Sequence, residues 1–392
     1  MPLRLCAAAG NRKACVFAIQ NQPTTNNHQL ITIFASVDHT QYIKRCFSLA
    51  ELAKGYTTPN PMVGAVLVHD GRIIGEGWHK QYGQAHAEVN CLESVANEDK
   101  ALIPESTMYV SLEPCAHHGK TPPCALRLVA EKVKKVVIAN IDPFEKVGGR
   151  GIEILNDAGI ETETGVSDKE GAWMNRRFFC FHREKRPYII LKWAQSANGY
   201  IAPADKSRLQ LSNAHSRQLV HKWRTEESAI MVGHATALAD DPQLTARLWQ
   251  GPQPLRIVLD KDLKLPHSLA LFNTEADTWI VNHHKEAAEG HVQYVKLPFY
   301  ENLLPQLLTR LHEANRLSLI VEGGAALLQS FITAGLWDEA RIFTAPVVLP
   351  DGLPAPQLTN AAAAFSTELD TDRLHVYTNI HTHYPYEPCM AL

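Results

Sequence analysis

Hydrophobic positions in the first half of the chain switch repeatedly between a helical spacing and the alternation of a strand. Apolar residues three and four apart predict an amphipathic helix, whereas alternating or short continuous apolar runs predict a strand. On this basis helices are expected over 41–54, 85–94, 123–131 and 151–158, and strands over 63–69, 72–78, 107–112, 135–139 and just before Gly165. Such an alternation predicts a three-layer α/β domain.

The second half continues to alternate, without resembling the first. Strands are expected over 188–193, 229–232, 256–259, 278–281 and 318–321, and helices over 216–224, 301–313 and 325–334. Between the halves, the run His182-Arg183-Glu184-Lys185-Arg186-Pro187 is charged and ends in proline, which is typical of a solvated linker. The predicted organisation is one domain over 38–181, a linker over 182–187 and a second α/β domain over 188–392.

The first 37 residues differ in composition from the rest of the chain. They contain no Asp or Glu and only three basic residues, Arg4, Arg12 and Lys13. Organelle transit peptides are richer in Arg, and secretory signals have a longer unbroken apolar core. An unstructured leader is therefore expected over 1–37, with the ordered chain beginning near Asp38.

Overall composition narrows the class of protein. The chain has 392 residues, 45% hydrophobic and 20% charged, which is typical of a soluble globular protein of two domains. A formal charge of −3 lacks the basic excess of a nucleic-acid-binding protein, so no nucleic-acid partner is expected. There is no run of roughly 18 apolar residues, so no membrane partner is expected either. Eight cysteines are too few for a disulfide scaffold, which favours the reducing cytoplasm.

Four residues of the first half have the chemistry of a catalytic zinc site. His86 precedes Glu88 by two positions, and Cys115 and Cys124 follow a predicted strand. One imidazole and two thiolates are good zinc ligands, and three protein ligands leave a fourth position open for water. Glu88 can then act as a proton shuttle without being a ligand, as in zinc-dependent base deaminases. A closed structural zinc site is the alternative, and it needs a fourth ligand such as His117 or His118.

The spacing of the two cysteines departs from the general deaminase signature Pro-Cys-x-x-Cys. Eight residues, 116–123, separate Cys115 from Cys124, in the sequence Ala-His-His-Gly-Lys-Thr-Pro-Pro. Together with the motifs at 58–64, 86–89, 112–124, 235–242 and 320–324, this insert makes the chain resemble the bifunctional deaminase/reductases of riboflavin biosynthesis. The resemblance extends from about residue 40 to the end of the chain.

For the first half, this resemblance implies a cytidine-deaminase-like three-layer domain that hydrolyses the exocyclic amine of a diaminopyrimidinone ribosylamine 5′-phosphate. His86, Cys115 and Cys124 would hold one zinc ion, and Glu88 would be the catalytic proton shuttle. Asn60, His117 and Lys120 would lie near the substrate. For His117 and Lys120, a solvated loop is an equally good interpretation.

For the second half, the resemblance implies a dihydrofolate-reductase-like α/β domain that uses NADPH to reduce the ribosyl group to a ribityl chain. Its cofactor-binding residues would be Ala194, Thr236, Asp240, Gly324, Ala325, Ala326, Leu327, Leu328, Gln329 and Ser330. Its substrate-binding residues would be Arg208, Arg224, Leu244, Arg247 and Glu322, with Lys192 as a further candidate. Independently, Gly323-Gly324 between a strand and a helix is typical of a phosphate-binding turn, although a simple tight turn has the same pattern.

Two positions depart from the family pattern. Asn198 stands where the family often has Asp, and Gln210 stands where related chains can have Trp. A deaminase with a weakened or inactive reductase half is therefore the main alternative function. A base-editing nucleic-acid enzyme would need a basic channel or an aromatic platform, and the sequence indicates neither. Family resemblance also implies a possible homo-oligomer formed through the second domain.

Overall fold

The structure is a computed structural model that describes residues 38–387 except 117–121, 145–147 and 206–208. The expected leader therefore lies outside the described residues, as do His117, Lys120 and Arg208. None of the described helices is long and apolar enough to cross a membrane.

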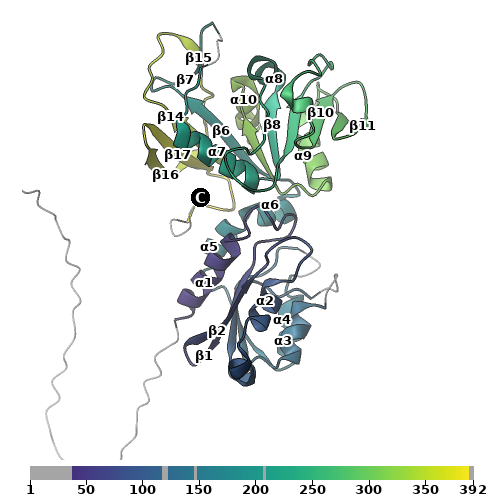
Figure 1. The fold of residues 1–392 in the computed structure, drawn as a ribbon, viewed down its shortest axis with the longest axis vertical. Coiled ribbons are helices and arrows are strands. Elements are labelled where there is room, and N and C mark those ends of the chain that lie inside the picture. Colours follow the sequence, from purple (N-terminus) through teal and green to yellow (C-terminus); the bar gives the residue numbers. More distant parts are fainter. Residues whose placement is uncertain (1–37, 117–121, 145–147, 206–208, 388–392) are drawn as a thin grey trace, which may run out of the picture. The chain divides into compact units, whose positions relative to one another are not determined.

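The first half is built on a five-stranded sheet covered by helices on both faces (Figure 1). Its elements are α1 (His39–Glu51), β1 (Gly64–His69), β2 (Arg72–Trp78), α2 (Ala87–Glu93), η1 (Asn97–Glu105), β3 (Thr107–Leu112), α3 (Cys124–Ala130), β4 (Lys135–Asn140), α4 (Arg150–Asp157) and β5 (Glu161–Thr164). The strand order is β2-β1-β3-β4-β5. The apolar faces of α2, α3 and α4 pack on one side of the sheet, and α1 packs on the other.

Two short helices, α5 (Asp168–Met174) and α6 (Arg176–Glu184), lead from the first sheet to the second half. Residues 182–184 complete α6, and Arg186 pairs with buried Asp338 at 2.6 Å. The first part of the expected linker is thus helical, while Arg183, Glu184 and Lys185 are exposed. The charged run comes at the end of α6, after six consecutive buried residues, 176–181.

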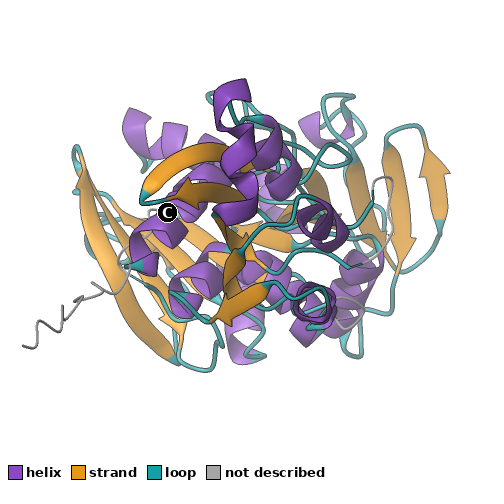
Figure 2. Cartoon of the chain, turned by 90° about the horizontal axis from the view of Figure 1, so that it is seen from below, coloured by secondary structure: helices purple, strands orange, loops and turns teal. Residues whose placement is uncertain are grey.

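The second half is built on a ten-stranded, mostly parallel sheet with helices on both faces (Figure 2). Its elements are β6 (Tyr188–Gln195), β7 (Tyr200–Pro203), α7 (Ala214–Glu226), β8 (Ala229–Gly233), α8 (His234–Asp240), β9 (Leu255–Leu259), η2 (Ala270–Phe272), β10 (Thr278–Asn282), β11 (Ala287–Glu289), β12 (Val292–Lys296), α9 (Leu303–Glu313), β13 (Ser318–Glu322), α10 (Ala325–Thr333), β14 (Glu339–Thr344), β15 (Gly352–Pro354), β16 (Ala361–Leu369) and β17 (Asp372–Asn379). The strand order is β11-β12-β10-β9-β8-β13-β6-β14-β17-β16, and β7 pairs separately with β15.

The side chains of this sheet alternate between two cores. Ile189 and Leu191 of β6 face α9 and α10, whereas Ile190 of the same strand faces α6. Both faces of a central parallel strand are thus buried, which explains why β6 and β13 are continuous apolar runs in the sequence. Because β6 and β13 are adjacent and parallel, the residues at their carboxyl ends lie at one edge of the sheet.

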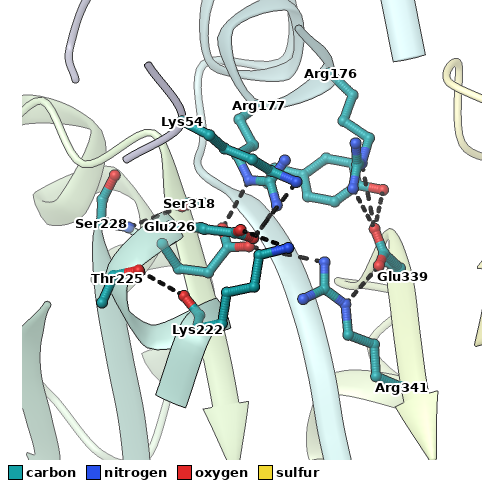
Figure 3. Close-up of polar contacts among 12 residues, drawn as sticks. Lys54, Arg176, Arg177, Lys222, Thr225, Glu226, Ser228, Ser318, Glu339 and Arg341 are labelled. Carbon is teal, nitrogen blue, oxygen red and sulfur yellow. Dashed lines mark hydrogen bonds and ion pairs between the residues drawn. The ribbon is translucent and has the colours of Figure 1, made fainter. Parts of the chain in front are cut away.

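A buried network of charges joins α6 to the second sheet (Figure 3). Arg176 contacts Glu339 of β14 at 3.1 Å, and Glu339 also accepts a hydrogen bond from Arg341 at 2.6 Å. Arg177 forms a paired hydrogen bond with Glu227, whose side chain is fully buried. Burial alone would raise the pKa of Glu227, but Arg177, Arg341 and a hydrogen bond with Ser318 together outweigh it and lower that pKa to about 2.

Replacing Glu227 by Gln is expected to lower the free energy of unfolding by about 3–5 kcal/mol, because buried Arg177 then loses the carboxylate that it is paired with. Urea unfolding measures this change. Glu289→Gln is the matched control, since it breaks only the exposed pair with Lys285 and should leave the unfolding midpoint unchanged. Equal effects of the two substitutions would contradict the assigned importance of the buried pair.

The pair of Arg177 and Glu227 also predicts that the free energy of unfolding depends on pH. The folded pKa of Glu227 lies below its ordinary value of 4.5, so its stabilisation is complete above about pH 4.5 and is lost as the pH falls toward 2. Between pH 5 and pH 2, the free energy of unfolding should therefore fall less steeply in Glu227→Gln than in the unaltered chain.

Candidate active sites

Three potential metal ligands of the first half converge on one point. His86 Nδ1 lies 3.5 Å from Cys115 Sγ and 3.3 Å from Cys124 Sγ. All three donor atoms are within 4.8 Å of one another. Tetrahedral bonds of about 2.0–2.3 Å to one nitrogen and two sulfurs place such donors about 3.5–3.8 Å apart. The donor set and its spacing therefore fit a zinc ion, with three ligands from the described residues.

Local folding explains why these residues meet. His86 is the residue before α2, and Cys124 is the first residue of α3, so each lies at a helix N-terminus. The Cys124 N–H donates to Cys115 Sγ at 3.3 Å, and free amide groups with the helix dipole favour thiolate over thiol. The hydrogen bond with the Cys124 side chain is the largest cause that lowers the pKa of Cys115, to about 4, and the hydrogen bonds with the His86 side chain and the Cys124 N–H act in the same direction.

Glu113 anchors the segment that carries Cys115. Its carboxylate accepts hydrogen bonds from the amides of Gly149 and Gly151 at the start of α4, at 3.0 and 2.9 Å. A Cβ on Gly151 would lie 2.0 Å from the Pro114 carbonyl oxygen, so only glycine allows this close approach. Glu113 is therefore a structural support of the metal-ligand loop.

The Glu88 carboxylate is buried beside the ligands, with only 3% of the residue exposed. Burial is the main cause that raises its pKa, to about 7. Together with His86 and Cys115 it lines a cavity of about 270 Å³, which we call the metal-side cavity. Glu88 therefore faces the space where a molecule near the metal ligands would lie.

Asn60 also lines the metal-side cavity, as the sequence predicts for a residue near the substrate. Its Nδ2 lies 3.1 Å from His79 Nε2, while His79 Nδ1 lies 3.1 Å from the Ala85 carbonyl oxygen. A carbonyl only accepts, so His79 carries its proton on Nδ1 and accepts at Nε2 from the Asn60 amide. The Asn60 carbonyl oxygen is then left as an acceptor for a ligand.

The outer wall of the metal-side cavity contains residues that sequence reasoning missed. Asp142 and Phe144 follow β4, His182 lies on α6, and Asn315 lies between α9 and β13. Burial raises the pKa of Asp142 to about 6. The position of Asp142 just after a strand was the only available signal, whereas His182 and Asn315 reach the cavity through long-range packing.

Two further cavities lie at the carboxyl edge of the second sheet. The glycine-side cavity, of about 550 Å³, is lined by Ala194, Thr236, Asp240, Gly323, Gly324 and Leu328, among others. Gly323 and Gly324 have φ of +107° and +69°, and a Cβ on either would lie 3.1 Å from Thr236. This tight turn exposes amide groups at the start of α10, an arrangement that suits the phosphates of a dinucleotide.

The arginine-side cavity, of about 500 Å³, is lined by several cationic residues. Arg247 and Lys192 are there as expected, and Arg217 and His221 are additional. The His221 Nδ1 accepts from the Arg247 backbone N–H at 2.8 Å, which fixes the Arg247 segment against α7. A cation-rich cavity of this kind suits a phosphorylated ligand.

The glycine-side and arginine-side cavities share a boundary formed by Lys192, Gln210, Ser212, Arg224, Pro242 and Leu244. At this boundary Arg224 donates two hydrogen bonds to Glu322, at 3.0 and 2.8 Å. Lys192 Nζ lies 3.7 Å from Glu322. Burial would raise the pKa of Glu322, but Arg224 and Lys192 together lower it to about 2, so this carboxylate is charged.

Other expected residues have different positions. Within the run 324–330 only Gly324 and Leu328 line the cavity; Gln329 accepts from the Gln357 backbone, and Ser330 donates to Leu327. Asn198 lines neither cavity and instead ties the turn after β6 to Leu349, donating at 2.7 Å and accepting at 3.1 Å. Gln210 lines both cavities.

The first sheet carries donor atoms that fit a deaminase-type zinc site. The second sheet carries two adjoining cavities whose linings suit a dinucleotide and a phosphorylated ligand. Together these features define a two-domain enzyme, a zinc-dependent deaminase joined to a reductase. Sequence comparison supports both halves. Residues 36–140 match the cytidine and deoxycytidylate deaminase zinc-binding region, and residues 187–377 match the RibD C-terminal domain.

Whole-chain comparisons agree. The riboflavin biosynthesis protein RibD of Aquifex aeolicus is 40% identical over 319 residues, 80% of this chain and 88% of the relative. The Escherichia coli protein is 34% identical over 326 residues, covering 79% and 88%. A crystal structure from Thermotoga maritima, described as a diaminohydroxyphosphoribosylaminopyrimidine deaminase/5-amino-6-(5-phosphoribosylamino)uracil reductase, superposes with a TM-score of 0.80 at 31% identity, covering 87% and 98%.

The chain belongs to the RibD family of bifunctional deaminase/reductases of riboflavin biosynthesis. The fold class, the zinc-type deaminase half and the NADPH-dependent reductase half expected from the sequence are thereby confirmed. Because both halves are present, the comparisons do not favour the alternative of a deaminase alone.

Proposed function

We propose that the first half hydrolyses the position-2 amine of 2,5-diamino-6-ribosylamino-4(3H)-pyrimidinone 5′-phosphate in the metal-side cavity. The observation that carries this proposal is the buried Glu88 carboxylate, which lines one cavity together with His86 and Cys115, while the Cys124 donor atom completes the group of three within 4.8 Å. Zinc held by these three residues would lower the pKa of water to about 7.

Each described residue then has a defined task. Glu88 takes a proton from the attacking water and returns it to the departing amine, so that ammonia leaves as a neutral molecule. The Asn60 carbonyl oxygen, oriented by His79, accepts a hydrogen bond from an N–H group of the pyrimidine ring. The apolar side chains of Val63 and Leu112 line the same cavity and hold the flat ring.

We propose that the second half reduces the ring-opened ribose imine of the deaminated product where its two cavities meet. NADPH in the glycine-side cavity would supply hydride to the imine carbon. Lys192, at the shared boundary, donates the proton that the imine nitrogen needs, which completes the saturated C–N bond. Burial lowers the pKa of Lys192, the direction that favours proton donation near neutral pH.

The remaining charged residues position these groups. Glu322 holds the Lys192 ammonium and is itself held by Arg224. Arg217 and Arg247 bind the 5′-phosphate of the substrate in the arginine-side cavity, because guanidinium groups pair with phosphate oxygens. Thr236, Asp240 and Gly324 contact NADPH.

A coupled assay on the purified chain tests the two-site proposal. Ammonia release and NADPH oxidation are followed in one sample supplied with the diaminopyrimidinone ribosylamine phosphate. A chelator should stop ammonia release while leaving NADPH oxidation intact on substrate that has already been deaminated. Ammonia release without any NADPH oxidation would contradict the proposal for the second half, and chelator-resistant deamination would contradict the proposal for the first.

A further inference from the structure

The outer wall of the metal-side cavity is formed by segments outside the five-stranded sheet. His182 is on α6, and Asn315 lies between α9 and β13 of the second half. Neither position belongs to the motifs that carry the metal ligands. Both line the same cavity as Glu88, so a ligand long enough to extend beyond the catalytic centre would meet them.

The His182 ring is held in place by aromatic neighbours. Its centroid lies 4.9 Å from Phe144, 4.4 Å from Phe178 and 5.2 Å from Phe181. Neither ring nitrogen makes a hydrogen bond to another described residue. Burial, together with nearby Lys185 and His312, lowers the pKa of His182 to about 4, so the imidazole is neutral and offers one donor and one acceptor.

Asn315 has a left-handed backbone conformation, and its side chain makes no hydrogen bond to another described residue. Its φ of +55° lies in the left-handed region, and its backbone N–H donates to the His312 carbonyl at the end of α9. Glycine satisfies such a position better than asparagine does. The Asn315 side-chain amide makes no hydrogen bond within the described part of the chain, and Asn315 lines the metal-side cavity.

We propose that His182 and Asn315 bind the ribosyl group of the deaminase substrate and thereby distinguish the ribosylamino compound from the free pyrimidine. This inference rests on the proposed deamination reaction. C2 and C6 flank N1 of the ring, so with the position-2 amine directed at Glu88 the substituent at position 6 diverges from it and reaches another part of the cavity lining, which includes His182 and Asn315. Neutral side-chain donors and acceptors match sugar hydroxyl groups, and no Lys or Arg lies among the described residues that line this cavity.

Kinetics of single variants provide the first test. His182→Phe keeps the aromatic packing and removes both ring nitrogens, and Asn315→Gly keeps the left-handed backbone and removes the amide. Each should raise the KM for deamination about 3–10-fold, the range for loss of one neutral hydrogen bond, with little change in kcat. His182→Gln should restore part of the affinity. Unchanged KM in both variants would overturn the proposal.

A truncated probe separates binding from packing. The probe is 2,5,6-triamino-4-pyrimidinone, which lacks the ribosyl phosphate, used as a competitive inhibitor of deamination. Its inhibition constant should be the same for the unaltered chain, His182→Phe and Asn315→Gly. If the variants weaken the probe as much as they weaken the substrate, the two residues shape the cavity in general and do not recognise the sugar.

His312→Phe is the matched control. His312 stacks on Phe181 at 4.2 Å, in the same aromatic cluster, but does not line the cavity. It should leave the deamination KM unchanged, whatever its effect on the melting temperature. Failure of the proposed function has a different signature, because the unaltered chain would then release no ammonia from this substrate at all.

Discussion

Glu88→Gln is expected to lower the rate of ammonia release by a factor of about 10²–10⁴, the range that a positioned general acid–base group contributes. The amide keeps the size of the side chain but cannot accept and return a proton. Because Glu88 is not among the proposed metal donors, His86, Cys115 and Cys124, the variant should retain its zinc. Ammonia release and zinc content, measured on the same preparation, check both parts of this result.

Two controls make this result specific. Glu93→Gln changes an exposed glutamate on the same helix, α2, and should leave deamination unaffected. NADPH oxidation with substrate that is already deaminated should be unchanged in Glu88→Gln, because the variant alters only the first site. Loss of zinc from Glu88→Gln would show instead that Glu88 supports the metal ligands.

Lys192→Met should reduce the kcat of the reductase by a factor of about 10²–10⁴ without affecting ammonia release, since the substitution removes the proposed proton donor. The fold should survive, because Glu322 keeps two hydrogen bonds from Arg224 after Lys192 loses its charge. Stopped-flow measurement of NADPH oxidation under saturating substrate gives the kcat directly.

Lys192→Arg separates two possible roles of this side chain. Arginine keeps the positive charge beside Glu322 but does not release a proton near neutral pH. A proton donor predicts that Lys192→Arg is nearly as slow as Lys192→Met. If the arginine variant retains most of the activity, Lys192 acts through its charge, and the source of the proton is another group.

The sequence predicted the first half better than the second. Strands 72–78 and 107–112 coincide with β2 and β3, because the Asp70-Gly71 turn marks the start of the first and the second is a short, mainly apolar run. The strands β14, β16 and β17 were not anticipated. β16 is largely exposed and rich in alanine, and antiparallel strands at a sheet edge depend on pairing partners far away in the sequence.

Among the candidate site residues, too, those in local motifs could be predicted from the sequence, and those brought together by long-range packing could not. Residues within compact motifs, such as His86 with Glu88, could be found because neighbours in sequence remain neighbours at the start of one helix. His182 could not, because its charged surroundings indicate a solvated segment, whereas packing against Phe144 brings it to the cavity. Gln210 was identified only as a departure from the family, and the structure now gives it a position between two cavities.

The parallel strands β6 and β13 keep the two reactions apart. His182 and Asn315 precede the amino ends of these strands, whereas Lys192 and Glu322 lie toward their carboxyl ends. At about 3.3 Å per residue, the five residues of β13 alone span roughly 13 Å, and Ile190 and Ile320 within the sheet are fully buried. This packed interior lies between the residues that line the metal-side cavity and those at the boundary of the other two cavities. If the aminouracil intermediate is released between the two sites, a slow reductase would let it accumulate, and ammonia release would then run ahead of NADPH oxidation in a single time course.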